Sequence, residues 1–192
     1  MNSPDPRHPF VFDTRTLSRR PGAMVTSTRT VDAPDDFGTE IIAIPAGNPV
    51  EIAVRFESVL EGVLVSGTAR GRASGACVRC LEAIEQPVEA DFQELFVYAD
   101  RAAHHREVGD DGDHSVLHDD LIDVETLVRD AVVPALPFQP VCRPDCPGLC
   151  SECGASLTAD PDHRHETLDP RWAALRQLGA HPDPIGETEK RT

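Results

Sequence analysis

Apolar and polar residues alternate along much of the region 39–98, and this alternation predicts β-strands. The clearest run has apolar residues at every second position, separated mostly by charged residues: Val50, Ile52, Val54 and Phe56. A period of two is typical of a strand with one face buried and one face in water.

Two further strands follow in the same region. One begins at Val63 after a turn at Glu61-Gly62, and three glycines predict that it breaks before Cys77: Gly67, Gly71 and Gly75. The next places Val88, Ala90 and Phe92 on one face and continues to Tyr98. Short strands at this spacing predict an antiparallel β-meander or a small barrel.

The pattern changes to a helical period after the strands. A helix over about 121–133 is predicted by one apolar stripe: Val124, Leu127, Val128, Ala131 and Val132. Asp120 or Asp123 can cap its start, and Pro134 and Pro137 are expected to end it. A second helix over 169–178 begins at Asp169-Pro170 and ends before Gly179, with one apolar face made by Trp172, Leu175 and Leu178. The predicted fold class is therefore α+β, with one or two helices.

These elements suggest an arm, one domain and a tail. Residues 1–22 form a polar N-terminal arm that docks through Phe10, Val11 and Phe12; 23–178 form a single domain; 179–192 form a disordered tail. Within the domain we expect a β region (39–98), an acidic, His-containing surface loop (99–118), a helix and its exit (119–137), a cysteine-rich zinc-binding segment (138–168) and the C-terminal helix (169–178).

The charge of the chain narrows the class of partner. The 192 residues carry a net charge of -15, and nucleic-acid binding relies on Lys and Arg that neutralise phosphates. DNA is therefore not expected as a partner, whereas a basic partner such as a ribosomal protein fits. The N-terminus lacks the apolar region of a signal peptide and no apolar run is long enough for a membrane span, so we expect a cytoplasmic protein.

Thiols stay reduced in the cytoplasm, where clustered cysteines indicate metal ligands more often than disulfides. The six cysteines form three close pairs, Cys77-x2-Cys80, Cys142-x3-Cys146 and Cys150-x2-Cys153, and His163 and His165 follow them. Zinc takes four such ligands in a tetrahedron. The eight residues thus predict two structural zinc sites. One would use Cys77, Cys80, Cys142 and Cys146, and the other Cys150, Cys153, His163 and His165.

Other arrangements remain open on the sequence alone. The last four cysteines can close one local site, or the two C-x2-C pairs can share one, which leaves one zinc. A redox pair or free thiols are further alternatives. A catalytic zinc would need a carboxylate base, for which Glu82 or Glu152 would serve. Histidines in the acidic loop are also candidate ligands: His104, His105, His114 and His118.

Several ordered segments resemble the YceD family of large ribosomal RNA subunit accumulation proteins, also known as domain of unknown function 177. They are FDTRTLSRRPG (12–22), LEGVLVSG (60–67), CVRCLE (77–82), FQELF (92–96), DDLIDVE (119–125), ALP (135–137) and CRPDCPGLCSECG (142–154). The resemblance covers about residues 10–178. Many members end with a further C-x-C pair, where this chain has His163 and His165.

The resemblance implies a bacterial, non-enzymatic factor in large-subunit biogenesis. Its partner would be the large-subunit precursor, through ribosomal protein or rRNA. RNA contact would involve local arginines: Arg19, Arg20, Arg70, Arg72 and Arg79. The alternatives are a zinc-dependent RNA hydrolase using Asp110, Asp111, Asp113, Asp119 and Asp120, and a thiol-redox or zinc-reservoir protein.

Overall fold

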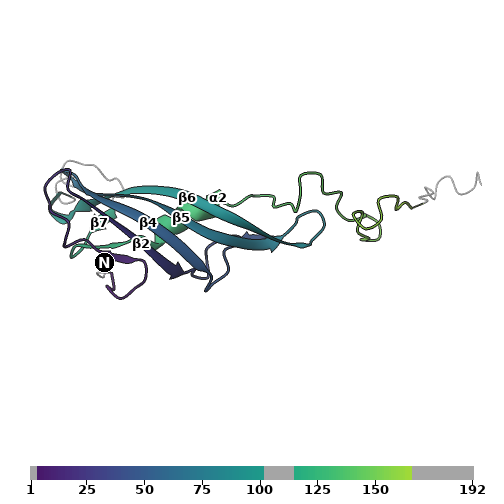
Figure 1. Cartoon of the computed structure of the whole chain (residues 1–192), viewed down its shortest axis with the longest axis horizontal. Helices are drawn as coiled ribbons and strands as arrows, with labels where there is room; N and C mark the ends of the chain where they lie inside the picture. The colour runs from purple at the N-terminus through teal and green to yellow at the C-terminus, as the bar shows by residue number, and fades with distance from the viewer. Residues whose placement is uncertain (1–3, 102–114, 166–192) are drawn as a thin grey trace, which may run out of the picture. The chain divides into compact units, whose positions relative to one another are not determined.

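A six-stranded sheet dominates the computed structural model, which describes residues 4–101 and 115–165 (Figure 1). The strand order is β2-β4-β5-β6-β7, and β3 also pairs with β5. The strands are β2 (Met24–Asp32), β3 (Ile42–Ala43), β4 (Pro49–Ser58), β5 (Gly62–Ala76), β6 (Ala83–Tyr98) and β7 (Ser115–Leu117). The α+β class is confirmed. The order of this sheet is an open path, which fits the meander rather than a closed barrel.

Pairing in the sheet is antiparallel except at one edge. β7 runs parallel to β6, with Val97 opposite Val116. The prediction of a loop over 99–118 is therefore wrong at its C-terminal end, because Ser115–Leu117 form strand β7. Residues 102–114, and with them His104, His105 and His114, lie outside the described residues. The predicted helix 169–178 and tail 179–192 do so too.

A second, two-stranded sheet explains why the helix begins later than predicted. β1 (Val11–Asp13) pairs with β8 (Leu121–Asp123), so residues 121–123 are extended and α2 spans Glu125–Ala135. Asp123 accepts a hydrogen bond from the backbone N–H of Glu125 at 3.0 Å, whereas Asp120 forms an ion pair with Arg19 instead of a cap. Leu136 is extended because it precedes Pro137, which ends the helix there, and Pro134 lies inside the last turn.

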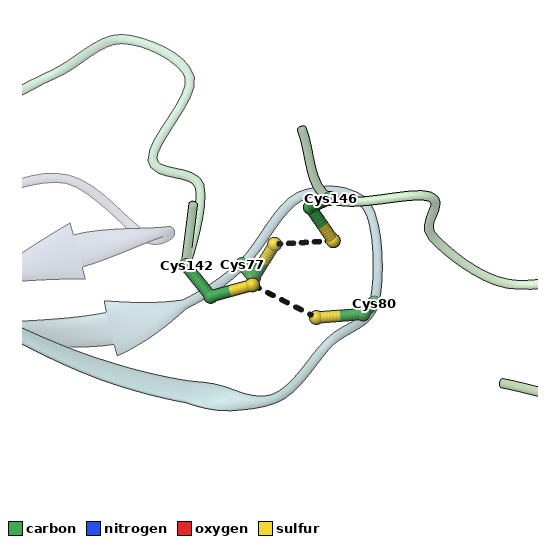
Figure 2. A group of neighbouring side chains, drawn as sticks. All are labelled: Cys77, Cys80, Cys142 and Cys146. Carbon is green, nitrogen blue, oxygen red and sulfur yellow. Dashed lines mark hydrogen bonds between the residues drawn. The ribbon is translucent and has the colours of Figure 1, made fainter. Parts of the chain in front are cut away.

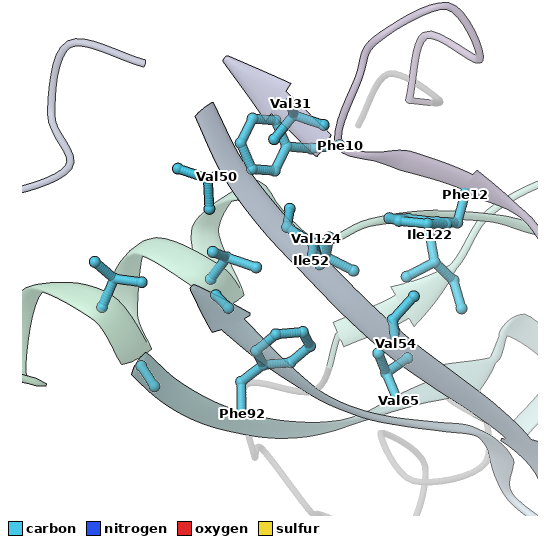
Figure 3. Close-up of a cluster of buried hydrophobic side chains, with 14 of the residues drawn as sticks. Phe10, Phe12, Val31, Val50, Ile52, Val54, Val65, Phe92, Ile122 and Val124 are labelled. Carbon is cyan, nitrogen blue, oxygen red and sulfur yellow. The ribbon is translucent and has the colours of Figure 1, made fainter. Parts of the chain in front are cut away.

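The hydrophobic core lies between the inner face of the sheet, α2 and the docked N-terminal segment (Figure 3). α2 packs against β6, and its predicted stripe is confirmed because Val124, Val128 and Val132 are buried. Phe10 and Phe12 are each 2% exposed, so the expected docking of this segment is confirmed too.

The glycines of β5 do not break the strand as predicted. The strand continues through all three, and each stands where other atoms come close: backbone at Gly67 and Gly75, and the side chain of Ile44 at Gly71. A Cβ at Gly67 would overlap the carbonyl oxygen of Ala53, and one at Gly75 would lie 2.9 Å from the Cα of Ile42. Close approach of neighbouring segments, rather than a turn, explains these glycines.

The chain divides into two compact units, Met1–Cys146 and Pro147–Thr192. Within 4–101 and 115–165, every strand and α2 belong to the first. The boundaries predicted for an arm, a single domain and a tail stay predictions. Among the described residues, no helix combines the length and apolar content that a membrane crossing requires.

Candidate metal centres

The first cluster consists of Cys77 and Cys80, from the connection between β5 and β6, and Cys142 and Cys146, from the segment that follows α2 (Figure 2). The Sγ atoms of Cys77 and Cys146 are 3.9 Å apart, and those of Cys80 and Cys142 are 3.7 Å apart. All four sulfurs lie within 4.8 Å of one another. Cys77, Cys80 and Cys146 are buried, so the cluster forms a small core of its own at this end of the first unit.

This spacing fits a tetrahedral metal. Zinc binds thiolate at about 2.3 Å, and a tetrahedron of that radius separates the sulfurs by about 3.8 Å. The two sulfur–sulfur separations given above, 3.9 and 3.7 Å, lie on either side of this value. Four thiols from two segments more than sixty positions apart in sequence therefore converge as a single ion would require.

Both C-x2-C loops fold in the same way. In the first, the N–H of Leu81 donates to the carbonyl of Cys77 at 2.9 Å, and the N–H of Cys77 donates to the carbonyl of Glu82 at 2.8 Å. In the second, Gly154 and Ala155 occupy the corresponding positions around Cys150, with the same two distances. The two loops are thus equivalent knuckles.

The knuckles differ in the residue that must adopt a left-handed conformation. Gly154 has φ +74° and Leu81 has φ +61°. A side chain other than glycine costs about 1 kcal/mol or more in this region. Leu81 is 67% exposed, so it gains little from burial there.

Replacing Leu81 with glycine is therefore expected to stabilise the first unit by about 1 kcal/mol. Chemical denaturation of the purified chain would measure it. Leu60→Gly is a suitable control because Leu60 is also exposed, at 72%, but has no positive φ. A Leu81→Gly chain less stable than the wild type would contradict this account of the knuckle.

Backbone hydrogen bonds favour the thiolate form of the first cysteine in each knuckle. Burial favours the neutral thiol of Cys77, but N–H groups of Cys142, Cys80 and Arg79 outweigh it and lower its pKa to about 6. The N–H groups of Cys153 and Glu152 likewise lower the pKa of Cys150 to about 6. In contrast, a hydrogen bond with Cys146, together with burial, raises the pKa of Cys142 to about 12. Cys142 therefore keeps its proton until a cation is present to balance a thiolate at this position.

Arg79 links the two loops of the first cluster. It stands inside the Cys77-x2-Cys80 knuckle, and its Nη1 donates to the carbonyl oxygens of Pro144 at 3.3 Å and Cys146 at 3.0 Å. The N–H of Val78 also donates to the carbonyl of Pro140 at 2.9 Å. Arg79 therefore holds the loop of Cys142 and Cys146 against the knuckle.

Substitution of Arg79 by alanine should weaken metal binding at the first cluster about tenfold, because the second loop loses two charge-assisted hydrogen bonds. Competition with a chromophoric chelator would measure it. Arg72→Ala is the matched control, since Arg72 is exposed and pairs with Glu85 on the sheet. Equal metal affinity in the two variants would show that Arg79 does not hold the site.

The second cluster belongs entirely to the second unit and is more exposed. Cys150, Cys153, His163 and His165 each offer a ligand atom within 4.8 Å of the others. The Nε2 atoms of the two histidines are 2.9 Å apart, and they lie 3.1 and 3.2 Å from the Sγ of Cys153. These separations are a few tenths of an ångström shorter than ideal zinc geometry, which is about 3.3 Å for N to N and about 3.6 Å for N to S.

The eight predicted ligands thus come together in two sets of four. These sets differ from the two arrangements with a single zinc, in which the last four cysteines or the two C-x2-C pairs would share one ion. Either set could hold a metal ion, and that they do so stays a prediction. His118 is not part of a candidate ligand group in the described regions.

A third candidate group, which was not predicted from the sequence, consists of His8, Asp123 and Glu125, close to the surface. The strand pairing of β1 with β8 brings it together, so no sequence spacing indicates it.

Most of the arginines considered for RNA contact are paired within the protein. Arg70 lies between Glu89 at 2.8 Å and Glu51 at 3.7 Å, and Arg72 pairs with Glu85. Arg19 pairs with Asp120 and stacks on the ring of Tyr98. The positive charges of these three side chains are therefore balanced by neighbouring carboxylates.

The hydrolase alternative predicted five aspartates as candidate carboxylates. Three of them, Asp110, Asp111 and Asp113, lie outside the described residues.

Comparison with known proteins identifies relatives over nearly the whole chain. An uncharacterized protein of Mycobacterium tuberculosis is 46% identical over 178 residues, which cover 92% of this chain and 85% of the relative. One of Mycobacterium leprae is 43% identical over 175 residues, covering 91% and 79%. One of Bacillus subtilis is 27% identical over 134 residues, covering 68% and 74%. No solved structure matches.

The profile of one protein family matches residues 65–179, a region that contains all eight clustered cysteines and histidines. Its description is "Large ribosomal RNA subunit accumulation protein YceD". Both this match and the relatives agree with the ordered motifs of the sequence, and the chain belongs to the YceD family.

Proposed function

We propose that this protein is a non-enzymatic, cytoplasmic factor that supports the accumulation of large-subunit ribosomal RNA, and that two structural zinc ions stabilise it. The observation that carries the proposal is the pair of four-ligand clusters in a chain of this family. One zinc would be bound by Cys77, Cys80, Cys142 and Cys146, and the other by Cys150, Cys153, His163 and His165.

The donor atoms favour zinc in a structural role. Thiolate with imidazole, in a tetrahedral arrangement, suits zinc rather than the hard cations that prefer oxygen. A catalytic zinc keeps one position open for water, whereas each cluster supplies four protein ligands. Four ligands leave no open position, and this supports a role in holding the chain together rather than in hydrolysis.

Charge supports a basic protein component of the large-subunit precursor as the partner. The chain carries a net charge of -15, and the arginines of its outer sheet face are paired with glutamates. An acidic surface of this kind attracts basic polypeptide and repels the phosphate backbone of free RNA.

Elemental analysis of the purified chain tests the zinc part of the proposal. We expect two zinc ions per chain, and one in a His163→Ala/His165→Ala variant. A chain without metal would overturn the zinc sites and favour the thiol-redox alternative. Ready loss of both ions to a weak chelator would favour a zinc reservoir.

The ratio of large-subunit to small-subunit rRNA in cells tests the biological part. We expect this ratio to fall when the gene is deleted and to recover when the wild-type chain is restored. An unchanged ratio after deletion would overturn the proposed function, whatever the metal content of the protein.

A further inference from the structure

Both histidines of the second cluster are oriented in the same way. Each directs Nε2 towards the sulfur of Cys153 and turns Nδ1 towards a carboxylate. The Nδ1 of His163 lies 3.8 Å from an Oδ of Asp160, and the Nδ1 of His165 lies 3.6 Å from an Oε of Glu152. The same arrangement therefore occurs twice in one small site.

Such carboxylates commonly control how a histidine binds metal. A metal-bound imidazole usually donates its second N–H to a carboxylate, which fixes the tautomer and the ring orientation. We propose that Asp160 and Glu152 are positioning residues of the second metal site, which hold the proton on Nδ1 so that Nε2 of each ring binds the ion. This inference rests on the zinc site proposed above and names two residues that act on it through the histidines.

The local backbone explains how each carboxylate reaches its ring. The N–H of His163 donates to the carbonyl of Asp160 at 3.2 Å, and this turn places the two side chains on the same side. Glu152 stands inside the knuckle, between Cys150 and Cys153, so one short loop offers two thiols and one carboxylate. Each carboxylate is therefore anchored by a turn that the cluster already contains.

The two rings are held at a steep angle to each other. They meet edge to face, with centroids 4.7 Å apart and planes at 81°. This angle brings the two Nε2 atoms together while the Nδ1 atoms point to carboxylates on different segments. Rotation of either ring by half a turn would move Nε2 away from Cys153 and disperse the donors.

The expected effect is on metal affinity and tautomer. Loss of a partner of this kind weakens metal binding by about 10- to 100-fold. Since Asp160 and Glu152 are exposed by 63% and 46%, we expect about tenfold for each. The conservative variants Asp160→Asn and Glu152→Gln should recover part of the affinity, because an amide oxygen can also accept the Nδ1 proton.

The test compares Asp160→Ala, Glu152→Ala and the double variant with these amide variants in the full chain. Zinc affinity of each site is measured by chelator competition, and ring nitrogen shifts in NMR spectra report which nitrogen carries the proton. Asp162→Ala is the matched control: it adjoins His163, and within the described residues it forms no ion pair with either histidine. The first cluster serves as the internal reference.

We expect about tenfold weaker zinc binding at the second site in each alanine variant and a mixture of tautomers in the double variant. Unchanged affinity and an unchanged Nδ1–H tautomer in the double variant would overturn the positioning role and leave the zinc site standing. A wild-type chain that binds zinc only at the first cluster would overturn the proposed second zinc itself, and the positioning role with it.

Discussion

Replacing Cys150 with alanine will unfold residues 147–165 and leave the sheet of the first unit folded. Within this described part of the second unit, only Gly148 is buried, so no apolar side chain is fully buried and the segment has little core of its own. Structural zinc contributes roughly 10 kcal/mol or more of apparent binding free energy to such segments. Without its fourth ligand the segment retains turns and little else.

The two units provide separate readouts of this change. Every residue of the main hydrophobic core belongs to the first unit, so its amide NMR signals should keep their positions. Amide signals of 147–165 should collapse towards random-coil values, and trypsin should cleave after Arg164 much faster. Ser151→Ala is the matched control, since Ser151 is exposed between the ligands. Dispersed signals for 147–165 in Cys150→Ala would show that the segment folds without metal.

Strong periodicity identified the elements at the centre of the fold. The inner residues of β4 and β6 follow a period of two over many positions, and the stripe of α2 follows a helical period. Such patterns arise because one face of the element is buried, so the element can be recognised from the spacing of its apolar residues. The eight clustered candidate ligands could be predicted for a related reason: zinc knuckles require fixed spacings along the chain.

Elements without a buried face left no such pattern. β2 was missed because only Val31 among its nine residues is buried, and its remaining residues are polar or exposed at the edge of the sheet. β1 and β8 have three residues each and pair across more than a hundred positions, which also moved the predicted helix start. The prediction that the glycines of β5 break the strand was wrong because the atoms that approach them come from segments distant in sequence.

The candidate sites likewise combine features that the sequence predicts with features that only the fold reveals. The candidate ligands are visible in sequence, but the roles proposed for Arg79, Glu152 and Asp160 depend on distances between loops. Arg79 was considered for RNA contact, yet its guanidinium binds two carbonyl oxygens beside Cys146. Glu152 was considered as a catalytic base, yet it faces the outer nitrogen of His165. Sequence spacing indicates which atoms can bind a metal, and the fold decides what surrounds them.

Substitution of Phe10 by alanine will destabilise the first unit by about 3–5 kcal/mol, the usual range for a buried phenylalanine. Phe10 is 2% exposed and meets the ring of Phe37 edge to face, with centroids 5.8 Å apart. The loss combines a cavity in the core with the loss of this aromatic pair. Its size would show that the N-terminal segment is an integral part of the fold rather than a loose arm.

Phe138→Ala is the matched control for this change. The same atoms are removed, but Phe138 is 90% exposed. The free energy of unfolding of the Phe138→Ala variant should therefore stay within about 0.5 kcal/mol of the wild-type value. Urea denaturation of both variants and the wild type gives the comparison. If Phe10→Ala were as stable as Phe138→Ala, the segment 10–13 would not be docked in solution. The pairing of β1 with β8 would then fail too, because Val124 donates its N–H to the carbonyl of Phe10 at 3.2 Å where the two strands meet.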